Sequence, residues 1–326
     1  MFFAKARQPR TTLFYASDIH GSEKCFLKFI NAAKFYSADV LVLGGDLTGK
    51  VMVPLVKVGP ARYKATFQGR EVLVASDDER RELERRIRFN GFYPVVLEPD
   101  EFEAVASDEH LRDELFEKVV SESIKRWVAV ADERLAGRDV RCIAYPGNDD
   151  EPCVEAILAT SEVIENADCR VIDLGRHELL GMGYSNLTPF HSPRELPEDE
   201  LERRLEELIG TMRSPETSIF ALHVPPSNSG LDMAPQLRVE DGELQVVSSA
   251  GHTVMAAVGS DAVRHVIERH QPLLGAHGHV HESRAVAKLG RSVCFNPGSE
   301  YSEGVLRGAL VVLEADQVVS CQLVAA

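Results

Sequence analysis

Several features are scarce or missing in this sequence. No stretch approaches the roughly 18 to 20 uninterrupted apolar residues that a membrane-spanning helix needs. The first residues, Met1 to Lys5, lack the long apolar core and the cleavage site of a secretory signal. The cysteines include no C-x-x-C pair and form no dense framework: Cys25, Cys142, Cys153, Cys169, Cys294 and Cys321. These absences predict a cytoplasmic protein with reduced thiols and no membrane partner.

Basic residues are also fewer than acidic residues. The chain has 36 Lys and Arg residues against 51 Asp and Glu residues, which gives a formal net charge of -15. Such a surface repels nucleic-acid backbones and anionic membranes at long range. The sequence also has no basic stripe studded with aromatic residues, so a nucleic-acid partner is not expected. A small phosphorylated substrate remains possible, because bound metal ions reverse the local field.

The chain of 326 residues is long enough for one large domain with an insertion. It begins with a strand-like run at 12–17, a helix capped by Ser22, and a second apolar run at 40–43. This strand–helix–strand order predicts a parallel sheet with right-handed crossovers. We therefore expect a single domain over 1–326, interrupted by an insertion at about 50–139.

The insertion has its own pattern. Strand-like runs at 51–57 and 63–67 flank Gly59-Pro60, which predicts a hairpin. Ser76 and Glu79 form a capping box before a helix that Gly91 ends. A longer helix is predicted from about 108 to 136, with a charged, solvated face. Beyond the insertion we expect further strands at 140–145, 218–222, 272–276, 291–295, 309–313 and 318–323, and helices at 197–209 and 260–270.

Side chains that can bind metal ions follow the predicted strands. They form five clusters along the chain: Asp18 with His20, Asp46, Asn148, His223, and His279 with His281. Ligands of α/β sheets bind beyond the carboxyl ends of the strands, so these clusters can converge on one site. Imidazole and carboxylate together favour zinc, manganese, iron, cobalt or nickel. Asp46 has two oxygens and can bridge two ions, which at about 3.5–4 Å separation can clamp a phosphoryl group and generate a hydroxide nucleophile.

The motifs around these residues resemble a known family. S-D-I-H-G, G-G-D-L, P-G-N-D-D, L-H-V-P-P and H-G-H-V-H occur in the order found in the calcineurin-like metallophosphoesterases. The long insertion after G-D-L-T-G-K and the late N-P-G-S-E-Y segment are similar to the prokaryotic branch related to the Icc cyclic-nucleotide phosphodiesterases. The resemblance implies an α/β fold, a four-layer α-β-β-α sandwich of two packed, mostly mixed sheets flanked by helices.

The resemblance also implies a ligand set for two divalent metal ions. One ion would take Asp18, His20 and His281, and Asp46 would bridge it to the second ion. The second ion would take Asn148, His223 and His279. His277 lies outside the matched G-H-x-H motif and is not expected to be a ligand.

One position departs from the family pattern. Where many members carry G-N-H followed by an acid, this chain has Asp149 in the position of the His, and Asp150 matches the acid that orients it. Histidine has an ordinary pKa of about 6.5 and aspartate of about 3.9, so an ionised Asp149 is a poor general acid. Two dications with the charges of Asp18 and Asp46 leave about +2, which Asp149 would reduce to about +1. We therefore expect a metal-dependent hydrolase that prefers phosphodiesters to alkyl phosphomonoesters.

Two other functions are compatible with the same motifs. Some relatives without the histidine act mainly as interaction scaffolds, and the insertion could be a docking surface. A nuclease of the same fold is the third hypothesis, against which the acidic composition argues.

Overall fold

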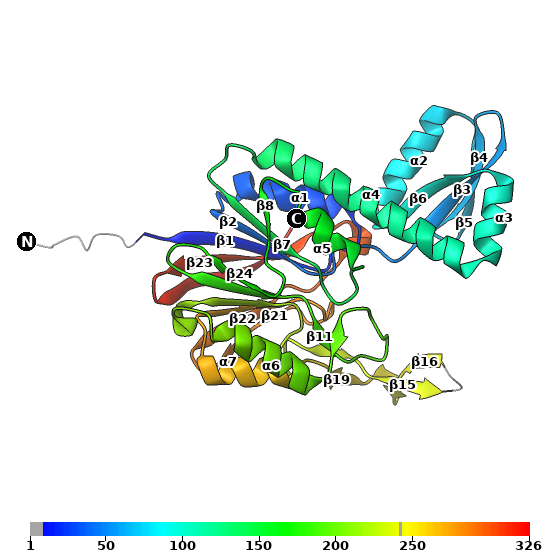
Figure 1. Cartoon of the computed structure of the whole chain (residues 1–326). Helices are drawn as coiled ribbons and strands as arrows, with labels where there is room; N and C mark the ends of the chain where they lie inside the picture. Colours follow the sequence, from blue (N-terminus) through cyan, green and yellow to red (C-terminus); the bar gives the residue numbers. More distant parts are fainter. Residues whose placement is uncertain (1–8, 241–242) are drawn as a thin grey trace, which may run out of the picture.

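The computed structural model describes residues 9–240 and 243–326, so Met1 to Lys5 lie outside the described part. Two six-stranded sheets pack face to face, and helices cover their outer faces (Figure 1). This arrangement confirms the predicted four-layer α/β sandwich.

The first sheet has the order β24-β23-β1-β2-β7-β8. Its strands are β1 Thr11–Ala16, β2 Val40–Gly44, β7 Arg141–Tyr145, β8 Ile164–Asn166, β23 Arg307–Glu314 and β24 Gln317–Ala325. The β1-β2-β7-β8 part is parallel, whereas β23 and β24 add antiparallel partners at one edge. The predicted parallel β-α-β start is therefore confirmed.

The second sheet has the order β21-β22-β20-β13-β10-β9. Its strands are β9 Arg170–Asp173, β10 Glu178–Met182, β13 Ile219–Leu222, β20 Leu274–Ala276, β21 Ala285–Leu289 and β22 Ser292–Asn296. The four central strands are parallel and the two edge strands antiparallel, so this sheet is mixed as well.

Side-chain alternation along the strands builds the core. Leu13 and Tyr15 of β1 point between the sheets, where the Tyr15 ring lies 5.3 Å from that of Phe295 in an edge contact. Phe14 and Ala16 point the other way, toward the helices. Both faces of β1 and β2 are covered, which explains why these strands are apolar without a break.

Helices cover the two outer faces. α1 (Glu23–Phe35), α4 (Glu109–Leu135) and α5 (Cys153–Leu158) lie on the first sheet, and α6 (Glu198–Ile209) and α7 (Asp261–His270) lie on the second. Ser22 caps α1 through the backbone N–H of Cys25, as predicted. In the described residues no helix is long and apolar enough to cross a membrane. All six cysteines are unpaired, and the cytoplasmic location stays a prediction.

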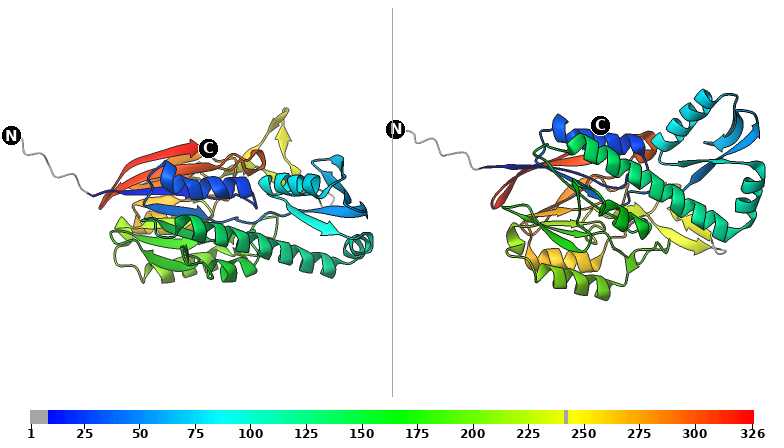
Figure 2. Two further views of the ribbon diagram at one scale, coloured as in Figure 1. Left: turned by 90° about the horizontal axis from the view of Figure 1, so that it is seen from above. Right: turned by 45° about the horizontal axis from the view of Figure 1, so that its top comes forward.

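The insertion builds a small sheet of its own, in the order β5-β4-β3-β6 (Figure 2). It contains β3 (Met52–Gly59), β4 (Arg62–Phe67), β5 (Arg70–Val74), α2 (Asp77–Phe89), β6 (Tyr93–Leu97) and α3 (Pro99–Ser107). The predicted hairpin and both predicted helices are present. β5, β6 and α3 were not predicted, because β5 is mostly exposed, β6 contains a proline, and α3 buries no residue. The domain boundaries stay a prediction.

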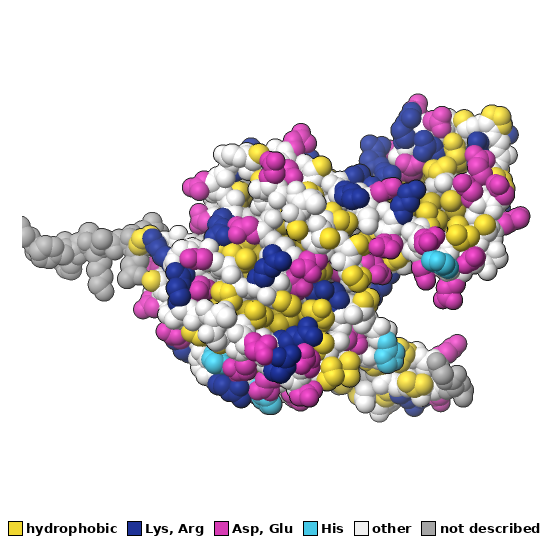
Figure 3. Space-filling view, viewed as in Figure 1, with side chains coloured by type: hydrophobic (Ala, Val, Ile, Leu, Met, Phe, Trp, Pro, Cys, Tyr) yellow, Lys and Arg dark blue, Asp and Glu magenta, His cyan; other side chains and the backbone are white. Residues whose placement is uncertain are grey.

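A second projection, here called the arm, comprises residues 233–240 and 243–257 and leaves the core on the same side as the insertion (Figure 1). Its short strands are β14 Met233–Pro235, β15 Leu237–Glu240, β16 Glu243–Val246, β17 Ser248–Ser249, β18 His252–Thr253 and β19 Met255–Ala257. The remaining elements are β11 Ser185–Asn186, β12 Glu195–Leu196, and the 3-10 turns η1 Pro215–Thr217 and η2 Tyr301–Glu303. The space-filling view shows an open notch between insertion and arm (Figure 3).

Candidate metal centre

The structure brings all seven predicted ligand residues together. Each follows the carboxyl end of a strand of one of the two sheets: Asp18 and His20 after β1, Asp46 after β2, Asn148 after β7, His223 after β13, and His279 and His281 after β20. Most are buried, with exposed fractions between 0 and 3% for Asp18, His20, Asp46, Asn148 and His223. Residues far apart in sequence thus form one polar cluster at one edge of the sandwich.

The loops that carry these residues have an unusual backbone. Asp18, His20, Asp46 and His279 all have positive φ values, between 38 and 65°. Such conformations are rare for residues other than glycine and gather at functional sites. Backbone hydrogen bonds hold the loops against one another, since Asp18 N–H donates to Gly45 O and His20 N–H to Asp46 O, both at 3.0 Å.

The first group of ligand atoms belongs to Asp18, His20 and His281, and all of them lie within 4.8 Å of one another. The Nε2 atoms of the two histidines face each other at 3.0 Å. The His281 Nε2 atom is also 3.5 Å from Asp18 Oδ1. Three ligand atoms that converge in this way can surround one cation.

The second group centres on Asn148. Its Oδ1 atom lies 3.1 Å from His223 Nε2 and 2.8 Å from His279 Nδ1. Asp46 Oδ1 is 3.3 Å from His223 Nε2, whereas Asp46 Oδ2 is 3.7 Å from His20 Nε2. The two oxygens of Asp46 therefore face different groups, an arrangement that would allow this carboxylate to bridge two cations.

The donor set fits divalent cations. The Nδ1–H of His223 donates to the Gly44 carbonyl oxygen at 2.8 Å, so its Nε2 lone pair points toward Asp46 and Asn148. A backbone acceptor that fixes the tautomer in this way is typical of metal-bound histidines. The two facing Nε2 atoms of His20 and His281 would likewise each offer a lone pair to an ion between them.

The charges of the cluster also favour bound cations. Burial opposes protonation of His223, but the carboxylates of Asp46 and Asp18 outweigh it and raise the His223 pKa to about 10. For His279, burial and the His223 charge lower the pKa to about 4. The buried carboxylates thus need positive charge beside them, which bound cations can supply in place of protons.

Asp149 lies at the rim of this cluster. Its backbone N–H donates to Asp46 Oδ1 at 3.1 Å, and its carboxylate forms a third group of close ligand atoms with His20 and Asp46. The carboxylate also accepts a hydrogen bond from the Ser192 hydroxyl and pairs with the Lys50 ammonium group. Asp149 is therefore paired with a cation, which the sequence analysis had not anticipated.

The Asp150 side chain contacts the loop after β2. Its buried carboxylate accepts from Leu47 N–H at 2.9 Å, Thr48 N–H at 2.7 Å, the Thr48 hydroxyl at 2.6 Å and Gly147 N–H at 2.7 Å. These four donors use both oxygens, a geometry that fits a positioning residue. The catalytic role of Asp150 stays a prediction.

His277 lies beside the cluster but outside all three groups of ligand atoms. Its Nδ1–H donates to the Leu222 carbonyl oxygen at 2.8 Å, and its side chain is fully buried. The exclusion of His277 from the ligand set stays a prediction.

Sequence reasoning missed three side chains that border the cluster. Lys50 and Ser192 contact Asp149. The Tyr301 ring lies 4.8 Å from the ring of His20 and 6.1 Å from that of His281. Lys50 is the last residue of the G-D-L-T-G-K motif, and Tyr301 is the last residue of N-P-G-S-E-Y. These two motifs could therefore have indicated that both residues lie near the site.

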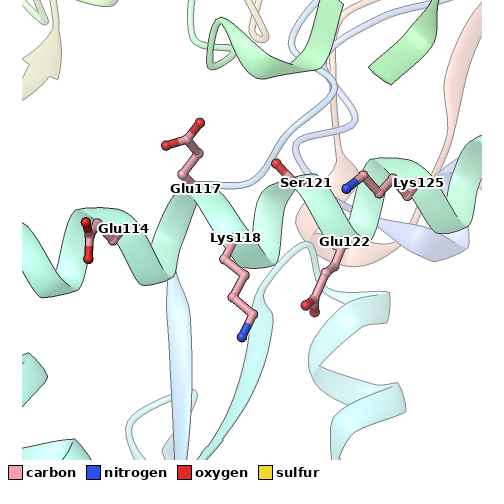
Figure 4. A pocket seen from close by; sticks show the side chains of 6 residues that line it. All are labelled: Glu114, Glu117, Lys118, Ser121, Glu122 and Lys125. Carbon is pink, nitrogen blue, oxygen red and sulfur yellow. The ribbon is translucent and has the colours of Figure 1, made fainter. Parts of the chain in front are cut away.

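A separate hollow of about 490 Å³ lies along α4 (Figure 4). It is lined only by residues of that helix: Glu114, Glu117, Lys118, Ser121, Glu122 and Lys125. Side chains of both charges surround it and none belongs to the metal cluster, in keeping with the predicted solvated face of this helix.

The sequence of this chain is similar to that of one curated protein over part of its length. No protein-family model matches the chain. Over 155 residues it is 30% identical to the uncharacterized protein MJ1162 of Methanocaldococcus jannaschii, a match that covers 44% of this chain and 62% of that protein. The match thus spans less than two thirds of the relative.

Two solved crystal structures superimpose on nearly the whole chain. One has a TM-score of 0.54 at 17% identity and covers 97% of this chain and 99% of its own. The other, TT1561 of Thermus thermophilus, has a TM-score of 0.52 at 16% identity and covers 94% and 100%. At this level of identity the likeness concerns the fold alone, and it agrees with the predicted α/β sandwich.

Proposed function

We propose that this chain is a metal-dependent phosphoesterase that binds two divalent cations and prefers phosphodiesters. The observation that carries the proposal is the position of Asp46, whose two oxygens face two separate groups of histidine and Asp or Asn ligands. The first cation would be held by Asp18, His20 and His281, and the second by Asn148, His223 and His279. Manganese, iron, zinc, nickel or cobalt would suit these ligands.

The protein residues would set the reaction geometry. When bound, the two cations would activate a water molecule and neutralise the phosphoryl charge. Asp46 would hold the two sites in register, and the Gly44 carbonyl would keep His223 in the tautomer that binds. Asp150 would keep the loop after β2 against the Asn148 loop through its four hydrogen bonds.

Metal removal tests the proposal. We expect the metal-loaded chain to hydrolyse bis-p-nitrophenyl phosphate and a chelator to reduce turnover at least about 100-fold, with recovery on addition of Mn²⁺. Metal content by mass spectrometry should approach about two ions per chain. Full metal content with no turnover of any ester would instead support the scaffold hypothesis, and efficient hydrolysis of sugar phosphates without diesterase activity would contradict the diester preference.

Asp149→His should raise the turnover of a sugar phosphate, an alkyl phosphomonoester, about tenfold or more, because histidine can protonate the leaving alkoxide oxygen near neutral pH. Asp149→Asn is the matched control, since it removes the same charge without adding an acid. Equal gains in both variants would attribute the effect to charge alone and contradict the role of a missing acid.

A further inference from the structure

Lys50 occupies a site beside the metal cluster that its surroundings fix closely. Three consecutive backbone N–H groups before it are anchored to buried acceptors. Those of Leu47 and Thr48 donate to Asp150, and that of Gly49 donates to the Tyr93 hydroxyl at 2.8 Å. The loop that presents Lys50 is therefore held from both the core and the insertion.

The Lys50 side chain spans the boundary between the cluster and solvent. Its ammonium group pairs with Asp149, whose carboxylate belongs to a group of ligand atoms with His20 and Asp46. The Lys50 side chain is 59% exposed, whereas that of Asp149 is 13% exposed. A molecule that reaches the metal ligands from solvent would thus meet the ammonium group at the entrance.

Among the groups around Asp149, Lys50 is the solvent-exposed partner. Asp149 Oδ1 accepts from the Ser192 hydroxyl and from Asn148 Nδ2, the latter at 3.2 Å. Oδ2 faces Lys50. The carboxylate is held by two donors that do not depend on Lys50, so the ammonium group can turn toward a ligand without releasing Asp149.

Charge counting favours an anionic ligand at this place. Two dications with Asp18, Asp46 and Asp149 leave about +1, and Lys50 restores the balance to about +2. That total suits one hydroxide and one phosphodiester monoanion. The Tyr301 ring borders the same cluster, since it lies 4.8 Å from the ring of His20.

We infer that Lys50 binds the phosphoryl group of the substrate, and that the Asp149–Lys50 pair stands where related enzymes carry a histidine. In this arrangement Lys50 donates a hydrogen bond to a phosphoryl oxygen, and Asp149 positions the ammonium group. The inference rests on the proposed function and deepens it, because it assigns the phosphodiester monoanion as the substrate charge class.

Lys50→Gln and Lys50→Arg test the inference in the metal-loaded chain. Lys50→Gln should raise KM for bis-p-nitrophenyl phosphate about tenfold, while Lys50→Arg should restore most of the affinity because it keeps the charge. Binding of inorganic phosphate, measured by calorimetry, should weaken by a similar factor. Lys57→Gln is the matched control, since Lys57 is an exposed lysine that pairs with Glu98 in the insertion.

The measurements separate the inference from the proposed function. Weaker phosphate binding by Lys50→Gln in a chain that binds metal but shows no turnover would support the inference and contradict the enzyme. KM and phosphate affinity within twofold of the parent chain would overturn the inference while leaving the phosphoesterase intact. Loss of metal from Lys50→Gln would also overturn it, because Lys50 would then act through the cluster and not on the ligand.

Discussion

Asp46→Asn is expected to reduce phosphodiester hydrolysis at least about 1000-fold, which corresponds to about 4 kcal/mol of transition-state stabilisation. Asp46 is 2% exposed, and its two oxygens face His223 and His20 at 3.3 and 3.7 Å. Asparagine keeps the shape of the side chain but offers one oxygen and no negative charge. The neutral amide oxygen of asparagine is a much weaker bridge between two cations than a carboxylate, so the variant should also bind fewer metal ions.

Steady-state turnover and metal content, measured on the same preparation, check this result. Asp316→Asn provides the control, because Asp316 lies exposed in the turn between β23 and β24 and takes the same substitution far from the cluster. The circular dichroism of both variants should match that of the parent chain. If Asp46→Asn kept its full metal content and more than a tenth of the turnover, Asp46 would not be the bridge.

The seven candidate ligands could be located from sequence because each stands just after an apolar strand. Asp18 and Asp46 follow strands with both faces covered, so each strand is an unbroken apolar run whose end is easy to place, and the loops beyond parallel strands emerge at one edge. The packing of two sheets depends on pairings between distant strands, such as β1 with β23, and only the resemblance implied it.

The surroundings of Asp149 could not be predicted in the same way. Lys50 lies in the loop before the insertion, 99 positions from Asp149, and Ser192 lies in a loop after β10, 43 positions from Asp149. No local sequence pattern encodes contacts across such separations. The contacts of Asp150 could not be predicted either. Its place beside Asp149 in sequence favoured a shared role, but neighbouring residues at a turn point in different directions, and its side chain faces the loop after β2.

Asp168→Ala should lower the free energy of unfolding by about 3–5 kcal/mol, because it leaves a buried guanidinium group without its partner. Asp168 and Arg194 form a salt bridge in which the side chains are only 4% and 8% exposed. Asp168 Oδ1 also accepts from Gly183 N–H at 3.0 Å, and the Arg194 guanidinium lies 4.2 Å from the Tyr184 ring. Urea unfolding of the metal-free chain measures the loss.

The same pair supports the metal cluster, which gives the experiment a second readout. The Arg194 backbone N–H donates to the Asn148 carbonyl oxygen at 3.2 Å, so the loop that the salt bridge holds also contacts the backbone of a candidate metal ligand. Asp168→Ala should therefore weaken metal retention as well as stability. Glu71→Ala, which breaks the exposed pair with Lys64, should lower the free energy of unfolding by less than about 1 kcal/mol and leave metal retention unchanged.

A double variant, Asp168→Leu with Arg194→Met, should regain most of the lost stability, because removing both charges leaves no buried charge without a partner. If the single and double variants were equally destabilised, the loss would come from packing around Tyr184 and not from an unpaired charge.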